Sequence, residues 1–415
     1  MRLFQPAAPL NGPLLGDEPM QHSMDASIKE AGSFEASLKV LYKIMADNAP
    51  HRFKETFEAI AEGLPKGGVV FHCTAGKDRT GMITALLLLF CGAARMDVVA
   101  DYRTTAAYIR PKIATLEKDS PLFPKSLLRS DPETLEDFLD HIESKYGGAT
   151  AFLKSAGVAD ETLEAIRRFI VAPNGDSDAV PKRLPFETLY NFRDMVGYPA
   201  KGGTLLFGKL FRSDFLGFLP QGDIDKIKAA KVATVIDLRS HVEHEKAPCS
   251  FDGADGIDYV QAPLITPQIR QEFKSTGDYE KDERNLFFNI MPNMGAANIG
   301  AAVKAVINAV PKGGVVFFCT AGKDRTGVLA ALLLAVCGVL VQDIAADYEV
   351  SETYMRAKCA TLPEGSPLLP KHPYVSPAEA MEQFLQDIGD VRQYLIDAGV
   401  SEAELAALEK YMVGE

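Results

Sequence analysis

The stretch Cys-Thr-Ala-Gly-Lys-Asp-Arg-Thr-Gly occurs twice in this chain of 415 residues, at Cys73–Gly81 and at Cys319–Gly327. Each occurrence follows a short β-branched and aromatic run that comes after a Gly-Gly pair, Gly68–Phe71 in one case and Gly314–Phe318 in the other. Such runs predict strands. An apolar run of about helical length follows each stretch. The sequence therefore predicts a strand, a tight loop and a buried helix at both places.

The repetition extends well beyond the loop. Leu64–Cys73 matches Val310–Cys319 almost residue for residue, and the same spacing relates Ala100–Tyr102 to Ala346–Tyr348. Self-similarity at a fixed spacing is the signature of a duplicated unit. We therefore predict two copies of one domain.

The two copies are unequal. Residues Leu184–Gly256 precede the second loop and have no counterpart before the first, so the first copy begins in the middle of the domain. We predict an incomplete copy over residues 1–171, a linker rich in Pro, Gly and Asp over 172–183, and a complete copy over 184–415. For the first copy three explanations stay open: it is inactive, it borrows a surface from its neighbour, or the natural protein starts upstream of Met1.

Strand and helix patterns alternate through the second copy. Val232–Leu238 reads as a buried strand that follows a helical stretch over Gly222–Ala230, and the ends of both copies, 132–170 and 377–412, read as amphipathic helices. Alternation of this kind predicts an α/β fold with a mostly parallel central sheet flanked by helices, in both copies.

Composition excludes several classes of protein. Hydrophobic residues make up 47% and charged residues 24%, which is typical of a globular chain, and the net charge of −12 with no basic run argues against a nucleic-acid partner. The longest apolar stretch, Met82–Ala94, is too short for a transmembrane segment. The six cysteines show no metal-ligand spacing, and His241 and His244 fit a solvated helix start better than a metal site. We expect a cytoplasmic protein without a metal or cofactor.

The repeated loop suits the binding of a phosphate. Its glycines allow a tight curl, its amides can form an anion-binding nest at a helix N-terminus, and an arginine supplies a planar fork for two oxygens. The same positive setting lowers the pKa of the cysteine thiol. The alternative is a buried cysteine in a glycine turn with the arginine in a surface ion pair. Retention of every loop residue in both copies favours the phosphate site.

The loop resembles the signature of the cysteine-dependent protein-tyrosine phosphatase superfamily. Tyr190–Met195, Leu210–Ser213 and Ile236–Arg239 resemble, more narrowly, the bacterial and fungal tyrosine/serine phosphatase branch that begins with Asn-Phe-Arg-Asp. The resemblance implies hydrolysis of phosphate monoesters through a phosphocysteine, on a phosphorylated protein or a phosphoinositide. A phosphate-binding pseudophosphatase in one or both copies is the alternative, and a rhodanese-type sulfur-transfer domain fits less well.

Roles follow from the resemblance, position by position. Cys319 would attack phosphorus, Arg325 would bind the equatorial oxygens, and Cys73 and Arg79 would do the same in the first copy. The phosphate-binding residues it implies are Thr320, Ala321, Gly322, Lys323, Thr326 and Gly327, with Thr74, Ala75, Gly76, Lys77, Thr80 and Gly81 as their first-copy counterparts.

The general acid is open, because the segment after Pro263 lacks the aspartate that many family members use. Asp324 and Asp78, inside the loops, are the candidates; ordering of the loop is their alternative role. Lys323 and Lys77 are expected at the rim, where their charge would suit phosphoinositides, or as merely solvated residues.

The residue before the nucleophile differs between the copies. The first copy has His72 there, a position that tunes the thiolate in the family, whereas the second has Phe318 in an otherwise fuller domain. We expect Cys319 to be the working nucleophile.

Overall fold

The computed structural model describes residues 34–119, 130–171, 182–366 and 369–414. The chain divides into a first unit, Met1–Ala179, and a second unit, Val180–Glu415. The described part of the chain contains no helix long and apolar enough to cross a membrane.

The second unit is built on a sheet of five strands in the order β1-β4-β7-β5-β6. The first pair is antiparallel and the other neighbours are parallel. A separate hairpin, β2 with β3, lies outside this sheet. The strands are β1 (Arg193–Asp194), β2 (Pro199–Ala200), β3 (Gly203–Thr204), β4 (Leu210–Ser213), β5 (Val232–Asp237), β6 (Asp258–Gln261) and β7 (Gly314–Phe318).

Strand β7 is central because its sequence is apolar on both faces. Val315, Val316 and Phe317 are fully buried between β4 and β5, as expected for a parallel strand covered on both sides. Val316 and Phe318 pack into the cluster that includes Ile227 of α9. The predicted strand and mostly parallel sheet are confirmed in this unit.

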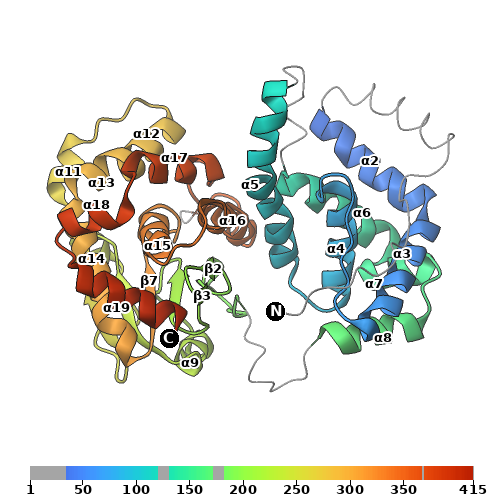
Figure 1. Ribbon diagram of the computed structural model, residues 1–415, viewed down its shortest axis with the longest axis horizontal. Coiled ribbons are helices and arrows are strands. Elements are labelled where there is room, and N and C mark those ends of the chain that lie inside the picture. The colour runs from blue at the N-terminus through green and yellow to red at the C-terminus, as the bar shows by residue number, and fades with distance from the viewer. Residues whose placement is uncertain (1–33, 120–129, 172–181, 367–368, 415) are drawn as a thin grey trace. The chain divides into compact units, whose positions relative to one another are not determined.

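Helices cover both faces of this sheet (Figure 1). The apolar run after the second loop forms α15, as predicted. The helices are α9 (Gln221–Ala229), α10 (His241–Lys246), α11 (Pro267–Glu272), α12 (Tyr279–Asn285), the π-helical η3 (Leu286–Ile290), α13 (Met291–Met294), α14 (Ala296–Ala309), the 3-10 turn η4 (Val310–Lys312), α15 (Asp324–Val336), α16 (Val341–Ala360), α17 (Ala378–Ile388), α18 (Val391–Asp397) and α19 (Glu402–Val413).

All the regular elements among the described residues of the first unit are helices, and the unit has its own apolar core. The strand predicted over Gly68–Phe71 is wrong: this segment is extended but belongs to no sheet. The physical reason is that strands equivalent to β4 and β5, which flank β7, do not occur among the described residues of this unit. Its elements are α2 (Phe34–Asn48), α3 (Pro50–Gly63), η1 (Leu64–Lys66), α4 (Asp78–Phe90), α5 (Arg95–Asp119), α6 (Pro132–Tyr146), α7 (Ala149–Ser155) and α8 (Asp160–Ile170).

Most of the predicted linker, residues 172–181, lies outside the described residues. Its last two residues belong to the second unit and pack against it: the Lys182 carbonyl accepts a hydrogen bond from the Asp194 amide at 2.8 Å, and the Arg183 guanidinium lies 5.8 Å from the centre of the Tyr354 ring. The domain boundaries given above remain a prediction.

Candidate active site

The second loop joins the end of β7 to the start of α15, so it lies at the carboxyl edge of the sheet. Gly322 has φ of +65°, and a Cβ added there would come within 2.3 Å of the Ser213 carbonyl oxygen. Glycine is therefore required at this position by both conformation and space. Strand β4, which ends at Ser213, fixes the path of the loop.

The loop carbonyls are turned outward by donors from the sheet half of the unit. The Phe215 amide donates to the Thr320 carbonyl at 3.1 Å, and the Asn191 side chain donates to the Ala321 carbonyl at 2.9 Å. Arg212 Nη2 donates to the Gly322 carbonyl at 2.8 Å. Because these carbonyls are already engaged, the loop amides remain as the groups that can bind an anion.

The donors Asn191 and Arg212 are held by a buried ion cluster. Arg193 Nε donates to Asp347 Oδ1 at 3.0 Å, Arg212 pairs with the other oxygen of Asp347, and Arg193 also pairs with Asn191. Burial alone would raise the pKa of Asp347, but the two guanidinium groups hold it well below its usual range. The Asn-Phe-Arg-Asp segment thus supports the loop from beneath.

Cys319 is buried at the start of the loop, with 3% of its surface exposed. The Thr326 hydroxyl is also buried and has no hydrogen-bond partner within the described residues. Burial lowers the pKa of Arg325, but the electrostatic interaction with the Cys319 side chain and the bonds to Glu243 outweigh it and raise this pKa. Arg325 is therefore a permanent cation coupled to the cysteine.

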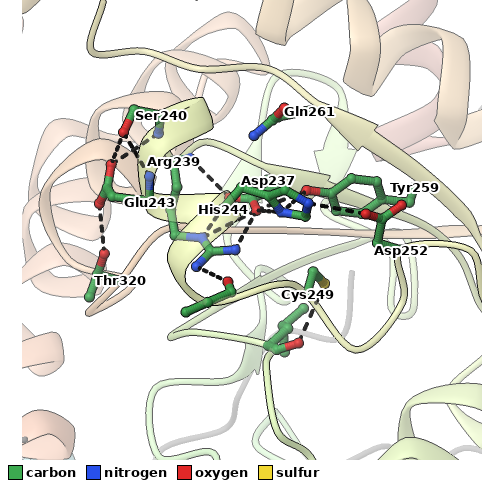
Figure 2. Close-up of polar contacts among 12 residues, drawn as sticks. Asp237, Arg239, Ser240, Glu243, His244, Cys249, Asp252, Tyr259, Gln261 and Thr320 are labelled. Carbon is green, nitrogen blue, oxygen red and sulfur yellow. Dashed lines mark hydrogen bonds and ion pairs between the residues drawn. The ribbon is translucent and has the colours of Figure 1, made fainter.

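Arg325 is held by a carboxylate, Glu243, that is not among the residues predicted from the sequence. Its Nη1 donates to Glu243 Oε2 at 2.8 Å and its Nη2 to Glu243 Oε1 at 2.9 Å. The Thr320 hydroxyl donates to the same carboxylate at 3.1 Å, and Ser240 fixes it in a capping box at the start of α10 (Figure 2). Burial raises the pKa of Glu243, but Arg325 and Ser240 lower it to about 2. The Ser-x-x-Glu spacing after Ile236–Arg239 was the signal that could have revealed this helix start.

Phe318, which replaces the histidine of the first copy, packs against Arg239. The Arg239 guanidinium lies 5.2 Å from the centre of the Phe318 ring and 4.3 Å from that of Phe215, and it pairs with Asp237 (Figure 2). This stacking packs the segment Ile236–Arg239 against the end of β7, the strand that precedes Cys319.

His244 contacts a tyrosine and an aspartate, and no three His, Cys, Asp or Glu side chains group as metal ligands would in the described part of the chain. Its Nδ1 lies 2.9 Å from the Tyr259 hydroxyl and its Nε2 lies 3.0 Å from Asp252 (Figure 2). The prediction that this run starts a helix is confirmed by α10.

Lys323 does not lie on the rim, which corrects the sequence prediction. Its side chain is fully buried and donates to Glu283 of α12 at 2.7 Å and to the Val375 carbonyl at 2.8 Å. A buried ammonium group needs such partners. Lys323 therefore ties the loop to α12 instead of offering its charge to solvent.

Asp324, the predicted acid candidate, is also largely buried. Its Oδ1 accepts a hydrogen bond from the Tyr348 hydroxyl at 3.1 Å and lies 3.4 Å from Lys323 Nζ. These contacts suit an ordering role, and its place at the first turn of α15 suits a carboxylate. The acid role remains a prediction.

The first-unit loop has the same residues in a more open setting. The Cys73 amide donates to the Thr80 hydroxyl at 2.9 Å, and Arg79 Nη2 donates to the Thr74 hydroxyl at 3.2 Å. Burial raises the pKa of the Cys73 thiol, but hydrogen bonds from Thr80, Ala75 and Gly76 lower it to about 7. A substantial fraction of this cysteine is therefore expected to be thiolate near neutral pH.

The two remaining charged residues of the first loop are also in contact with the protein, although Asp78 has a different tyrosine as its partner from that of Asp324. Asp78 accepts a hydrogen bond from the Tyr42 hydroxyl at 2.7 Å, and the Lys77 side chain is buried beside it, 3.4 Å away. Lys77, like Lys323, is therefore not a rim residue. A Cβ at Gly81 would meet the Tyr102 ring at 2.7 Å, as one at Gly327 would meet Tyr348 at 2.8 Å.

Comparison with known proteins gives a consistent result. A model of the tyrosine phosphatase family matches residues 7–172 and 184–414. A tyrosine-protein phosphatase of Nostoc commune is 31% identical over 151 residues, which cover 32% of this chain and 49% of that protein. The triple specificity protein phosphatase PtpB of Mycobacterium tuberculosis is 30% identical over 139 residues, which cover 29% of this chain and 48% of that protein. The chain thus spans about half the length of these two relatives.

Among solved structures, TpbA of P. aeruginosa aligns with 49% of this chain and 95% of its own, at 14% identity and a TM-score of 0.27.

Proposed function

The chain belongs to the tyrosine phosphatase family through both of its units, and from this membership we propose that it hydrolyses phosphate monoesters, above all phosphotyrosine in proteins, at the loop of its second unit. The observation that carries the proposal is the arrangement around Cys319: outward-turned carbonyls, free loop amides and an arginine fork fixed by Glu243. These groups suit a trigonal, negatively charged phosphoryl group in transfer.

The proposed reaction has two steps. The Cys319 thiolate attacks phosphorus, a sulfur–phosphorus bond forms, and the bond from phosphorus to the ester oxygen breaks. Arg325 and the loop amides stabilise the equatorial oxygens in this step, and the buried Thr326 hydroxyl donates to the sulfur when it later leaves. Water then attacks the phosphocysteine, releases phosphate and restores the thiol.

Asp324 is the proposed donor of the proton that the leaving oxygen takes up. A test is to compare Asp324→Asn with the parent on an aryl ester with a good leaving group and on one with a poor leaving group. We expect the variant to lose more activity on the poor leaving group. If the variant lost the same fraction of the parent's activity on both esters, Asp324 would only order the loop.

The whole proposal is tested by hydrolysis of an aryl phosphate by the parent, Cys73→Ser, Cys319→Ser and the double variant. We expect Cys319→Ser to abolish turnover and Cys73→Ser to leave most of it. No turnover by the parent would refute the enzyme and leave a phosphate-binding pseudophosphatase. Loss of turnover only in Cys73→Ser would assign the working site to the first unit.

The proposed substrate is a phosphorylated protein. Because Lys323 and Lys77 are buried, neither offers the exposed charge that a phosphoinositide headgroup would recognise. Parallel assays with a phosphotyrosine peptide, a phosphoserine peptide and a phosphoinositide would rank the classes. The need for free thiols supports a reducing, cytoplasmic location.

A further inference from the structure

The two copies of one strand lie in different surroundings. Val316 in β7 is fully buried, whereas its counterpart Val70 is 87% exposed. Val69 and Phe71 pack against the helical core of the first unit, while Val70 and His72 face away from it and are exposed. One face of the extended segment is thus covered and the other is open.

The backbone of this segment is also unpaired. Among the described residues no amide from Gly68 to His72 donates to a backbone carbonyl, whereas β7 is paired along both edges, with β4 and with β5. Unpaired edges on both sides are strong templates for added strands. The segment has the conformation of a central strand without its neighbours.

The phosphate-binding loop of the first unit likewise lacks neighbours on one side only. A Cβ at Gly322 would collide with the Ser213 backbone of β4, but a Cβ at Gly76 would meet nothing within 4 Å. On the opposite side, toward α5, Gly81 keeps the close contact with Tyr102 that Gly327 makes with Tyr348. The helical half of the site is therefore preserved, and the groups missing are those that the sheet half supplies.

An acidic partner for that sheet half is retained as well. Asp347 receives both Arg193 and Arg212 in the second unit. Its counterpart, Asp101, has no side-chain hydrogen bond or ion pair with any described residue. The first unit therefore has the aspartate, Asp101, but among its described residues it has no counterparts of Arg193 and Arg212.

We propose that the first unit is a receptor for the sheet half of a phosphatase domain of this family, supplied by a further polypeptide segment. Gly68–His72 would lie between two parallel strands of that segment, as β7 lies between β4 and β5, and Asp101 would accept its two arginines. The second unit cannot donate its own strands, because they are already paired with β7 and their arginines with Asp347. A small anion fits less well, since it would satisfy neither strand edge.

The test is to attach a second copy of residues 183–262 to the N-terminus of the full chain through a flexible Gly/Ser linker and to measure amide hydrogen exchange. We expect exchange of Gly68–His72 to slow by about 100-fold or more, because pairing removes these amides from water. A matched chain with Arg193→Ala and Arg212→Ala in the added copy, or with Asp101→Asn in the first unit, should show much less protection. Gly314–Phe318 should stay protected in every chain.

Three results would overturn the proposal: unchanged exchange in the extended chain, equal protection with and without the arginines, or full protection of Gly68–His72 before any segment is added. The exchange measurement does not depend on catalysis. Its failure is therefore distinguishable from failure of the proposed phosphatase activity, which the cysteine variants test.

Discussion

Glu243 and Arg325 form a two-pronged ion pair at 2.8 and 2.9 Å, so the arginine that would bind phosphate is already oriented by a carboxylate from another element. The carboxylate is itself fixed, because Ser240 donates to it from the start of α10 at 2.7 Å. Both arginines donate to the threonine of their own loop, Arg325 to Thr320 and Arg79 to Thr74, but no carboxylate holds Arg79 among the described residues of the first unit. The orientation of the arginine is a property that distinguishes the two loops.

Glu243→Gln should lower kcat/KM of the second unit by about 10- to 100-fold, because the neutral amide weakens the hold on Arg325 and small displacements of a binding group are costly. The assay is aryl phosphate hydrolysis in a Cys73→Ser background. Since the pKa of Glu243 is about 2, the parent should keep this contact over the whole working pH range.

Glu245→Gln, on the same short helix but exposed, is the matched control and should retain parental activity. A Glu243→Gln enzyme as active as this control would show that the ion pair does not orient Arg325 for catalysis.

Gly322→Ala and Gly76→Ala should differ sharply although the two loops are identical in sequence. Both place a side chain at positive φ, which costs about 1–2 kcal/mol. Only Gly322→Ala adds a collision with the Ser213 backbone at 2.3 Å, so only this variant should displace the loop and reduce turnover by 100-fold or more. Equal losses in both variants would contradict the geometry.

Asp347→Asn should destabilise the second unit by roughly 3–5 kcal/mol, because it leaves two buried arginines without their counter-charge. Asp101→Asn should have little effect on the first unit, where no arginine reaches that carboxylate among the described residues. Urea unfolding followed separately for the two units by hydrogen exchange would measure both values. Similar effects at the two positions would argue against the buried ion cluster.

The stability of the second unit should depend on pH because of the same buried ion cluster around Asp347. The pKa of Asp347 is depressed in the folded state, so its stabilisation is present above the unfolded pKa of about 4 and is lost as pH falls through the folded value. Unfolding free energy of the parent should therefore fall steeply below about pH 4. Asp347→Asn should show a flatter acid limb, and an unchanged limb would assign the acid sensitivity to other groups.

Alkylation of Cys73 by iodoacetamide should reach half its maximal rate near pH 7, because burial is outweighed by hydrogen bonds that lower its pKa to about 7. The rate should rise about tenfold per pH unit below that point, as the thiolate fraction does. Peptide mass spectrometry on Cys319→Ser protein would follow it. Cys91, whose pKa is raised by burial, is the internal control; a midpoint for Cys73 as high as that of Cys91 would refute the assignment.

Local sequence patterns were sufficient to predict the loop, β7, β5 and the helices α9 and α15. Each of these strands and helices corresponds to a short run of mainly apolar or amphipathic sequence bounded by glycines or polar residues. The strand over Gly68–Phe71 was wrong for the complementary reason. A strand needs partners, and the run of residues that favours it says nothing of whether partners exist.

The site residues that the sequence did not reveal depend on distant contacts. Glu243 lies 82 residues from Arg325 along the chain, and only the fold brings them together. Lys323 was expected at the rim because lysines are usually solvated, but Glu283 of α12 compensates its charge and allows burial.

The position of β7 between β4 and β5 has a consequence for how the chain folds. A ribosome completes β4 and β5 well before it reaches β7, so the slot between them stays open for the time needed to make the intervening residues. The nearly identical segment Gly68–His72 has by then already been made. We therefore expect the earlier segment to compete with β7 for this slot during synthesis, as a kinetic trap of the kind that long-range pairing allows. Rapid burial of Val69 and Phe71 in the local helical core of the first unit would keep that strand out of the slot until its proper occupant emerges.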